Sequence, residues 1–351
     1  MPISLSQARA EFTQRLVAVL REEPQTTNFL RAFFRNETST TRFVSIEAER
    51  GFEYIAEDVV RGTEGNRNTF SQSTEKIFDP PIYREYFDAT SLRLYDVVLG
   101  ALRSDNAQIF MSLMDDVASK LRSLRNKIER AKEKQCADIL MDGILNLKHG
   151  GQINYYRKSA SLVDPGAGNY FADNIDPFAQ LAAGCYFMRT AGKAQGGVFN
   201  AILGTESLAD LLNNTKFKER QDLVNMKLDA VTGPVRDNNT GSAFHGQVTA
   251  ESYKVNLWTY PQYYQNSSKV YVPYIDSKKV VMLPESPNFV MAHAAVPQLI
   301  DNPGQVPQQG EYVYGEFPDY RKNTHEYDVQ SAPLAIPVAV DQIYTFRAKA
   351  A

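Results

Sequence analysis

The longest uninterrupted helical pattern in the chain covers residues 104–148. Its apolar side chains recur mostly at alternating steps of three and four residues, which places them on one face of an α-helix. They are Phe110, Leu113, Val117, Leu121, Leu124, Ile128, Ala131 and Ile139. Ser104 or Asp105 can cap the start, and Gly150 with Gly151 supplies the backbone freedom of a helix stop. At about 1.5 Å per residue the helix is predicted to span roughly 60 Å, so it must lie across a large body.

Two further patterns precede this helix. Residues 4–21 form a short amphipathic helix that Pro24 separates from the rest, so we expect a distinct N-terminal arm. From residue 40 to residue 56, β-branched and aromatic residues alternate with charged ones, and residues 70–81 return as a second extended run. The polar stretch 61–69 between them has no apolar side chain. This arrangement predicts a long β-hairpin that projects from the body, because neither strand is apolar enough to bury both faces.

The region after the long helix mixes strands and helices. Helical spacing predicts helices over 177–190 and 208–227, the second one entered from a buried strand at 198–203 through Gly204. Residues 297–324 have four prolines and three glycines with little periodicity, so we expect a loop there. The other predicted strands are 152–158, 255–260, 270–274, 280–283 and a last one near 338–346 that closes the sheet.

Composition is that of an ordinary globular protein. A chain of 351 residues can form two domains, or one domain with large excursions. The 38 basic and 41 acidic residues give a net charge of -3, so any contact with nucleic acid or membrane must be local. Cys136 and Cys185 lie among apolar neighbours, which indicates buried reduced thiols. No export signal and no apolar run of about 18 residues is present, which favours a reducing cytoplasm.

One local excess of positive charge lies on the long helix. Seven basic residues between positions 120 and 134 are accompanied by only two acidic ones, Glu129 and Glu133. The basic residues are Lys120, Arg122, Arg125, Lys127, Arg130, Lys132 and Lys134. Such a face is either solvated beside an apolar seam, paired with acids of the same subunit, or a surface for a partner or polyanion. The heptad spacing also fits a coiled-coil dimer, although strand signals around it argue against that.

The sequence offers no recognisable catalytic, cofactor-binding or metal site. The four histidines, at 149, 245, 293 and 325, are isolated and lack the spacing of metal ligands on a helix. The glycine-containing stretch 164–170 lacks the flanking strand and helix of a phosphate-binding loop. The Gly-x-Ser-x-Gly motif that marks a nucleophilic serine does not occur. We therefore expect no enzyme activity and no cofactor.

Several stretches in sequence order resemble the lambda-type tailed-phage major capsid proteins, the phage capsid protein E family. These stretches are Phe-Leu-Arg-Ala-Phe-Phe-Arg at 29–35, Val-Val-Arg-Gly at 59–62, Pro80-Pro81, Leu-Trp-Thr-Tyr at 257–260, Tyr-Val-Pro-Tyr-Ile at 271–275 and Gln-Ser-Ala-Pro-Leu at 330–334. Each motif is only moderately specific. Their shared order over most of the chain carries the resemblance.

The resemblance implies an α+β fold of the Hong Kong 97 phage capsid type. The chain would then divide into an N-terminal arm at 1–41, the hairpin region called the E-loop at 42–90, a peripheral domain at 91–196, an axial domain at 197–318 and a return to the peripheral domain at 319–351. The long helix at 104–148 becomes the spine helix of the peripheral domain. Relatives with a large N-terminal scaffolding domain differ from this chain, whose scaffold we expect to be a separate protein.

The function implied by the resemblance is a major capsid protein. Such a protein self-assembles into the pentamers and hexamers of an icosahedral shell that encloses the double-stranded DNA genome of a tailed bacteriophage, and it is assembled in the host cytoplasm. The partners expected are further copies of the chain, a scaffolding protein, a portal and a decoration protein, with no membrane. Two alternatives stay open at this point: an α/β enzyme with an unrecognised site, and a cell-encoded nanocompartment shell of the same fold.

Two sets of residues are candidates for contacts. For contacts between subunits we expect Phe12, Leu16 and Leu20 on the arm, and Arg61, Glu64 and Arg67 on the hairpin tip. For weak, non-specific contact with packaged DNA we expect Arg122, Arg125 and Lys132, because the spine helix of this fold runs along the inner side of the shell.

Overall fold

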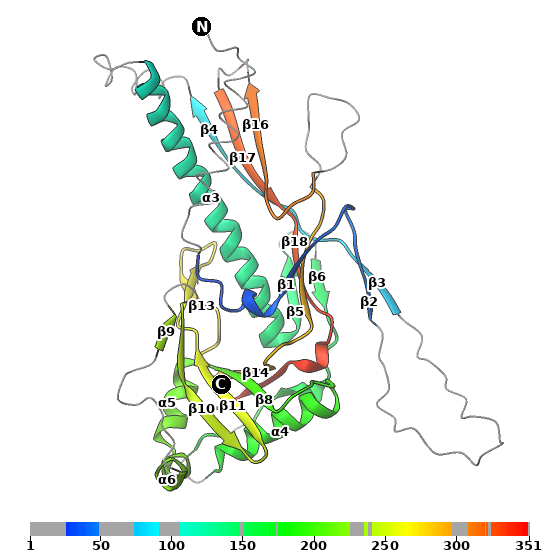
Figure 1. The fold of residues 1–351 in the computed structure, drawn as a ribbon, viewed down its shortest axis with the longest axis vertical. Coiled ribbons are helices and arrows are strands. Elements are labelled where there is room, and N and C mark those ends of the chain that lie inside the picture. The colour runs from blue at the N-terminus through cyan, green and yellow to red at the C-terminus, as the bar shows by residue number, and fades with distance from the viewer. Residues whose placement is uncertain are drawn as a thin grey trace, which may run out of the picture.

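The computed structural model describes residues 26–48, 74–90, 106–147, 151–166, 168–172, 175–224, 235–237, 241–296, 308–319, 321 and 324–349. Residues 1–25 of the predicted arm and the hairpin tip at 61–69 lie outside these residues. The molecule is elongated, with helix α3 (Asn106–Asp142) along its upper part and a large sheet with helices at its lower end (Figure 1).

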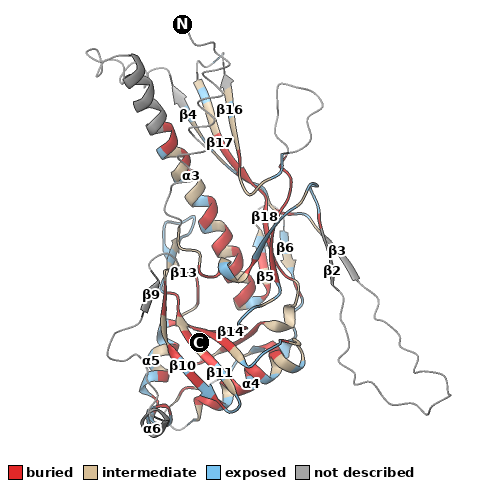
Figure 2. Ribbon diagram, viewed as in Figure 1, coloured by how far each residue is buried: buried red, intermediate tan, exposed pale blue. Residues whose placement is uncertain are grey.

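Helix α3 packs against a three-stranded antiparallel sheet of order β16-β17-β4. These strands are Val313–Asp319, Thr324–Ser331 and Tyr83–Thr90. The apolar stripe predicted from the sequence forms the contact, because Val117, Leu121, Leu124 and Ile128 are buried against Val329 of β17. The C-terminal turns of the same helix enter a second core through Ile139 and Leu140, among other residues. Figure 2 shows buried residues along the described part of α3, so one helix joins two cores.

The long helix ends earlier than the sequence predicted. It stops at Asp142, and Gly143 takes a left-handed backbone with φ of 70° while its N–H still bonds to the carbonyl of Ile139 at 2.9 Å. The chain then forms β5 (Ile144–Leu147), which pairs with β6 (Gly151–Asn154). The predicted stop at Gly150 and Gly151 is therefore wrong, because a glycine inside the apparent pattern provides the C-terminal cap.

The lower part of the molecule is a seven-stranded sheet of order β7-β19-β14-β8-β11-β10-β9. Helix α4 (Pro177–Thr190) has the predicted bounds, and its buried face packs on this sheet. The central strands β8 and β14 are almost fully buried, whereas β11 alternates between buried and partly exposed residues over most of its length (Figure 2). The strands are β7 Leu162–Val163, β19 Tyr344–Arg347, β14 Lys279–Pro284, β8 Val198–Leu203, β11 Tyr253–Thr259, β10 Ser242–Ala250 and β9 Val235–Asp237.

The helix predicted at 208–227 is two helices, α5 (Thr205–Asn213) and α6 (Thr215–Val224). Asn214 separates them with an extended backbone, and its buried side-chain amide donates to the carbonyl oxygens of Ala172 and Ile175 at 2.6 and 3.0 Å. The side-chain oxygen of Asn214, Oδ1, accepts the N–H of Phe217 at 3.0 Å and so caps α6. These bonds to a distant loop break the helix at a position that helical spacing does not reveal.

Smaller sheets complete the fold. A three-stranded sheet of order β1-β15-β18 lies between the β16-β17-β4 sheet and the seven-stranded sheet (Figure 1). The strands β2 and β3, which flank the predicted hairpin tip, pair in antiparallel register from Val44 opposite Phe78 to Ala48 opposite Thr74. The remaining elements are η1 Arg31–Phe33, β1 Arg35–Thr38, β2 Val44–Ala48, β3 Thr74–Phe78, η2 Ser159–Ser161, β12 Tyr263–Gln265, β13 Tyr271–Pro273, β15 Phe289–His293, β18 Pro333–Pro337 and η3 Val340–Gln342.

One expectation about the C-terminal third needs correction. The predicted loop 297–324 contains β16, an edge strand that tolerates Pro318 because one side of an edge strand needs no ladder hydrogen bond. The last strand, β19, lies between β7 and β14 in the seven-stranded sheet, and its Thr345 hydroxyl donates to the Leu140 carbonyl oxygen of α3 at 2.8 Å. Strand β4, placed with the E-loop by sequence, pairs with β17. The proposed domain boundaries otherwise stay a prediction.

Candidate functional site

Of the two sets of candidate contact residues, the structure describes only the basic residues on α3. Lys132 does not lie on the surface, because its side chain is fully buried. Its Nζ donates to Glu311 Oε1 at 3.0 Å and to the Tyr312 hydroxyl at 2.7 Å. Burial lowers the pKa of Lys132 to about 8. The expectation that Lys132 faces DNA is therefore wrong, since residues 311 and 312 seal it inside the subunit.

Arg122 and Arg125 are partly exposed. The Arg125 guanidinium lies 4.7 Å from the centre of the Tyr312 ring, and its Nε is 4.0 Å from Glu129 Oε1. These contacts orient the Arg125 side chain without removing it from solvent. Contact of Arg122 and Arg125 with DNA stays a prediction.

The rest of the basic face is largely engaged within the subunit. Lys127 bonds to Glu85 of β4 at 3.1 Å, and Lys134 pairs with Asp138 one turn along the helix. The Lys120 ammonium lies 5.5 Å from the centre of the Phe87 ring. Arg130 is exposed. Pairing with acids of the same subunit, one of the alternatives from the sequence, thus describes Lys127, Lys132 and Lys134.

A buried charge cluster lies beside this face, where four segments meet. Helix α3 contributes Glu129, Lys132 and Glu133, and the other segments contribute Arg31, His293, Glu311 and Tyr312. Glu129 accepts from both the Arg31 guanidinium and the Tyr312 hydroxyl. Arg31 and Tyr312 are 98 and 183 positions away from Glu129 in the chain. Their contacts therefore join η1, α3 and the residues just before β16.

Burial shifts the pKa values in this cluster away from their ordinary range. It raises the pKa of Glu133 to about 7, despite hydrogen bonds that favour the carboxylate. It lowers the pKa of His293 to about 4, with Lys132 acting in the same direction. Burial acts to raise the pKa of Glu311, but the charges of Lys132 and Arg31 outweigh it, so that pKa is lowered. The cluster thus holds Glu133 ready to gain a proton near neutral pH and keeps His293 neutral.

Sequence reasoning did not find this cluster. The one available signal was the position of Glu129 and Glu133, four residues apart and alone among basic neighbours. Their partners Arg31 and Glu311 lie in segments whose closeness depends on the tertiary fold.

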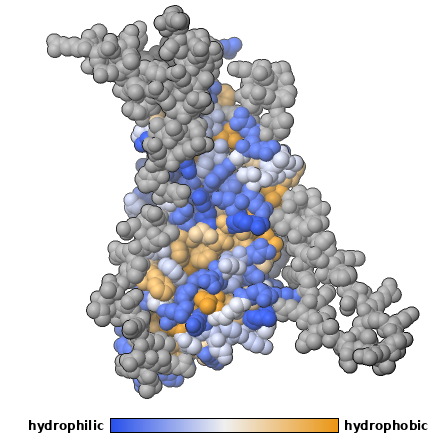
Figure 3. All heavy atoms as spheres, viewed as in Figure 1, coloured by the Kyte–Doolittle hydropathy of each residue, from blue (hydrophilic) through white to orange (hydrophobic). Residues whose placement is uncertain are grey.

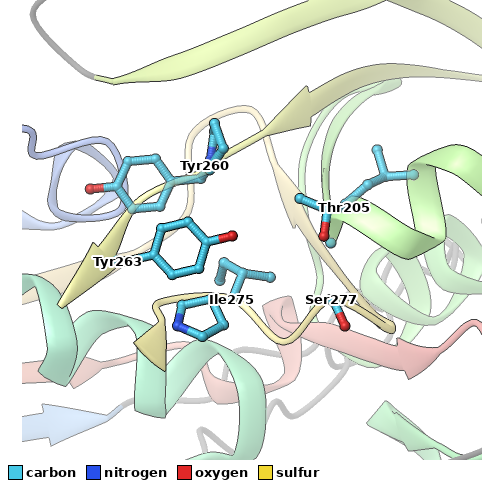
Figure 4. A pocket seen from close by; sticks show the side chains of 9 residues that line it. Thr205, Tyr260, Tyr263, Ile275 and Ser277 are labelled. Atoms are coloured by element: carbon cyan, nitrogen blue, oxygen red, sulfur yellow. The ribbon is translucent and has the colours of Figure 1, made fainter. Parts of the chain in front are cut away.

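A small pocket lies between the β12–β13 hairpin and the start of α5. Tyr260 and Tyr263 line one side of it, Thr205 and Ser277 line the other, and Ile275 lies between them (Figure 4). The lining is completed by Leu203, Gly204, Pro261 and Pro273. The lining holds no carboxylate, histidine, lysine or cysteine, so it offers no acid–base pair for catalysis.

In the part of the chain that the structure describes, no three His, Cys, Asp or Glu side chains gather as a metal site would require. Among the described helices, none is long and apolar enough to cross a membrane. Cys136 and Cys185 are both buried and free, as expected.

The surface and the predicted contact residues can be placed only in part. Phe12, Leu16, Leu20, Arg61, Glu64 and Arg67 lie outside the described residues, so they stay predictions. On the face seen in Figure 3, an apolar band crosses the middle between hydrophilic regions. Several large apolar side chains are exposed, including Tyr156, Tyr186 and Tyr271.

Comparisons with known proteins agree with this fold. Residues 12–348 match the family model described as phage major capsid protein E. A prophage capsid protein from Escherichia coli CFT073 has a similar structure, with 14% identity, a TM-score of 0.64 and coverage of 95% of this chain and 98% of that one. A phage-related protein from Bordetella bronchiseptica RB50 has 11% identity, a TM-score of 0.52 and coverage of 95% and 96%. No curated protein gives a significant match.

Proposed function

The chain belongs to the phage major capsid protein E family, and from this premise we propose how it builds a shell. Copies of the chain form the pentamers and hexamers of an icosahedral capsid around the double-stranded DNA genome of a tailed bacteriophage. The match of the family model over residues 12–348 carries this conclusion. The α+β fold, with its paired hairpin strands and long helix, has the architecture of phage capsid subunits.

The family is one of structural proteins, and we propose that this chain has no catalytic role. Its partners would be other copies of itself, a separate scaffolding protein, a portal and a decoration protein. It would be assembled in the cytoplasm of the bacterial host and remain in the capsid of the virion.

Assembly is tested by expressing the full chain with and without its scaffold and measuring particle mass. We expect closed shells or capsomers, seen by sedimentation and electron microscopy. A stable small oligomer under all these conditions would overturn the proposal. Shells that form in the absence of any phage gene product but the chain would show that no separate scaffold is needed.

Contacts between subunits are proposed for the arm and the hairpin tip. Phe12, Leu16 and Leu20 would supply an apolar face to a neighbouring copy, and Arg61, Glu64 and Arg67 would reach a neighbour from the tip. Support comes from the described root of the hairpin, where β2 and β3 pair as a two-stranded sheet and an exposed ion pair joins Arg42 to Asp79. Because a two-stranded ribbon is marginal alone in water, a neighbour would stabilise it.

Contact with packaged DNA is proposed for Arg122 and Arg125. Such binding would come from counterion release and would lack sequence preference. Replacing both residues by Gln should weaken binding of the subunit to duplex DNA and reduce the log-log salt slope by about 2, at roughly 0.9 per phosphate contact. Lys127→Gln is the matched control, because Lys127 is paired with Glu85. An unchanged salt slope in the double variant would exclude DNA contact by these two residues.

A further inference from the structure

Residues 28–34, called the root of the arm below, are a described part of the predicted arm and connect residues 1–25 to the rest of the chain. At this root the short helix η1 begins, and its N-cap, Leu30, makes no side-chain capping bond. Glu133 of α3 provides that cap instead. Its Oε1 accepts the Leu30 N–H at 2.8 Å, and its Oε2 accepts the Arg31 N–H at 3.2 Å. The cap therefore comes from a residue more than 100 positions away.

The root is held on several other sides. The Arg31 guanidinium pairs with Glu129 and lies 3.4 Å from Glu311 Oε1. The Phe29 ring packs 5.4 Å from Trp258 and 5.6 Å from Tyr260, measured between ring centres. The Leu30 side chain is fully buried. These contacts fix the root against α3 and β11, so the point at which the arm leaves the body is defined.

Stability alone is a poor explanation for an ionisable group in this place. Glu133 is only 2% exposed, and burial makes its charged form costly. A short helix on the surface could be capped by water or by a local Ser, Asp or Asn at no such cost. A buried ionic group is weak evidence of added stability, and in some proteins such a group selects one arrangement of the chain.

We propose that Glu133 is a positioning residue that fixes the root of the N-terminal arm to α3, so that every copy directs its arm to the same place on a neighbour. This inference rests on the proposed role of residues 1–24 in contacts between subunits. In a closed symmetric assembly, identical copies must present the same element in the same position, and a loose root would spread the arm over many positions.

The test uses the full chain with Glu133→Ala and Glu133→Gln. Amide hydrogen exchange of residues 29–34 should become roughly ten- to hundredfold faster in Glu133→Ala, because two buried N–H groups lose their acceptor. Glu133→Gln keeps one acceptor oxygen and should fall between this variant and the parent chain. Exchange in β8 and β14 should stay unchanged. Shell yield should fall in the same order as protection of the root.

Two controls separate positioning from general destabilisation. Glu85→Ala removes an exposed carboxylate that also faces α3, and it should leave exchange at the root unchanged. Val281→Ala lowers stability by removing buried core volume. If its urea midpoint is as low as that of Glu133→Ala, it should still form normal shells. If Val281→Ala loses as many shells as Glu133→Ala does, the positioning role of Glu133 is overturned.

Further outcomes are decisive. Unchanged exchange at the root in Glu133→Ala would overturn the anchor, as would normal shells despite a root that exchanges freely. If Glu133→Ala fails to fold, Glu133→Gln is judged by the same two measurements. Removing residues 1–24 tests the underlying proposal separately. Normal shells from this truncation would reject the arm as a contact, while exchange in Glu133→Ala would still decide whether Glu133 holds the root.

Discussion

His293 shows how a single buried side chain couples folding to pH. It is 1% exposed, and in the part of the chain that the structure describes neither ring nitrogen has a hydrogen-bond partner. The charges that face it are Lys132, Glu311 and Arg31. Because burial and the nearby cations disfavour a third positive charge, its pKa falls to about 4. The imidazole of the folded protein is thus neutral at pH values well above 4.

The consequence is a loss of stability in acid. An unfolded histidine gains its proton near pH 6.5, whereas the folded one stays neutral down to about pH 4. The contribution of His293 is therefore fully present above pH 6.5 and is lost as the pH falls toward 4, by roughly 3 kcal/mol in total. Urea unfolding of His293→Leu should show a flatter pH dependence over this interval than the parent chain. Identical slopes in the two proteins would contradict the assignment.

Lys132 marks the limit of sequence reasoning at this scale. Helical spacing correctly identifies which residues share a face of α3, and it placed Lys132 there with Arg122 and Arg125. It carries no information on what covers that face. Tyr312, 180 positions away, takes Lys132 out of solvent and leaves Arg122 and Arg125 partly exposed. The buried cluster around Glu133 was missed for the same reason.

At the scale of elements, the end of α3 depends on one glycine and one arginine. Burial lowers the pKa of Arg157 to about 10, although Asp142 and Asp341 favour its charge. Its guanidinium donates to the last carbonyl oxygens of the helix, those of Leu140 and Met141, at 3.0 and 3.2 Å. The same guanidinium bonds to the Thr345 hydroxyl of β19 at 3.1 Å. The helix end is thereby tied to the seven-stranded sheet.

Gly143 and Gly151 form a matched pair for testing this junction. Both have a left-handed backbone, with φ of 70° and 77°. A Cβ at Gly143 would lie 2.4 Å from Arg157 Cδ, whereas a Cβ at Gly151 would meet nothing within 4 Å. Gly151→Ala should cost about 1 kcal/mol from backbone strain alone. Gly143→Ala should cost about 3 kcal/mol or more, because it also displaces bonds made by a charged group. Urea unfolding measures both, and equal costs would show that Arg157 moves freely.

The elements that sequence predicted best are those whose own residues determine them. Helix α4 has a strong periodic face, and the side chain of Asp176 caps its start while Pro177 occupies the first turn. Strand β8 is a continuous buried run. By contrast, Asn214 divides the predicted helix at 208–227 through bonds to residues 172 and 175, and β16 exists because β17 is available to pair with it. Tertiary partners decide such cases.

At the scale of the whole molecule, the predicted hairpin is expected to matter for assembly more than for folding. Deleting the tip, residues 61–69, should abolish shells while the subunit keeps its unfolding midpoint, since the three cores in the described part of the chain are built from other segments. Sedimentation and urea unfolding on the same preparation measure the two effects. Shells of normal size from the deletion variant would rule out the tip as a contact between subunits.

The order of the elements along the chain was easier to predict from the sequence than the residues at which each element begins and ends. The order of arm, hairpin, long helix and mixed α/β region follows from local patterns and from motifs shared with the family. The assignment of strands to sheets does not follow, because β4 and β19 pair with partners from distant parts of the chain. Long-range pairing of this kind leaves no mark on periodicity.

The pairing of β4 with β17 can form only late in synthesis of the chain. Arg84 and Asp328 bond across these strands although 244 positions separate them. At about 5–20 residues per second, the ribosome needs roughly 12–50 s to make the intervening chain. Until then the sheet beneath α3 lacks its central strand, and the helix has only part of its supporting surface. The sheet that supports α3 is therefore complete only after β17, which ends at Ser331, has been synthesised.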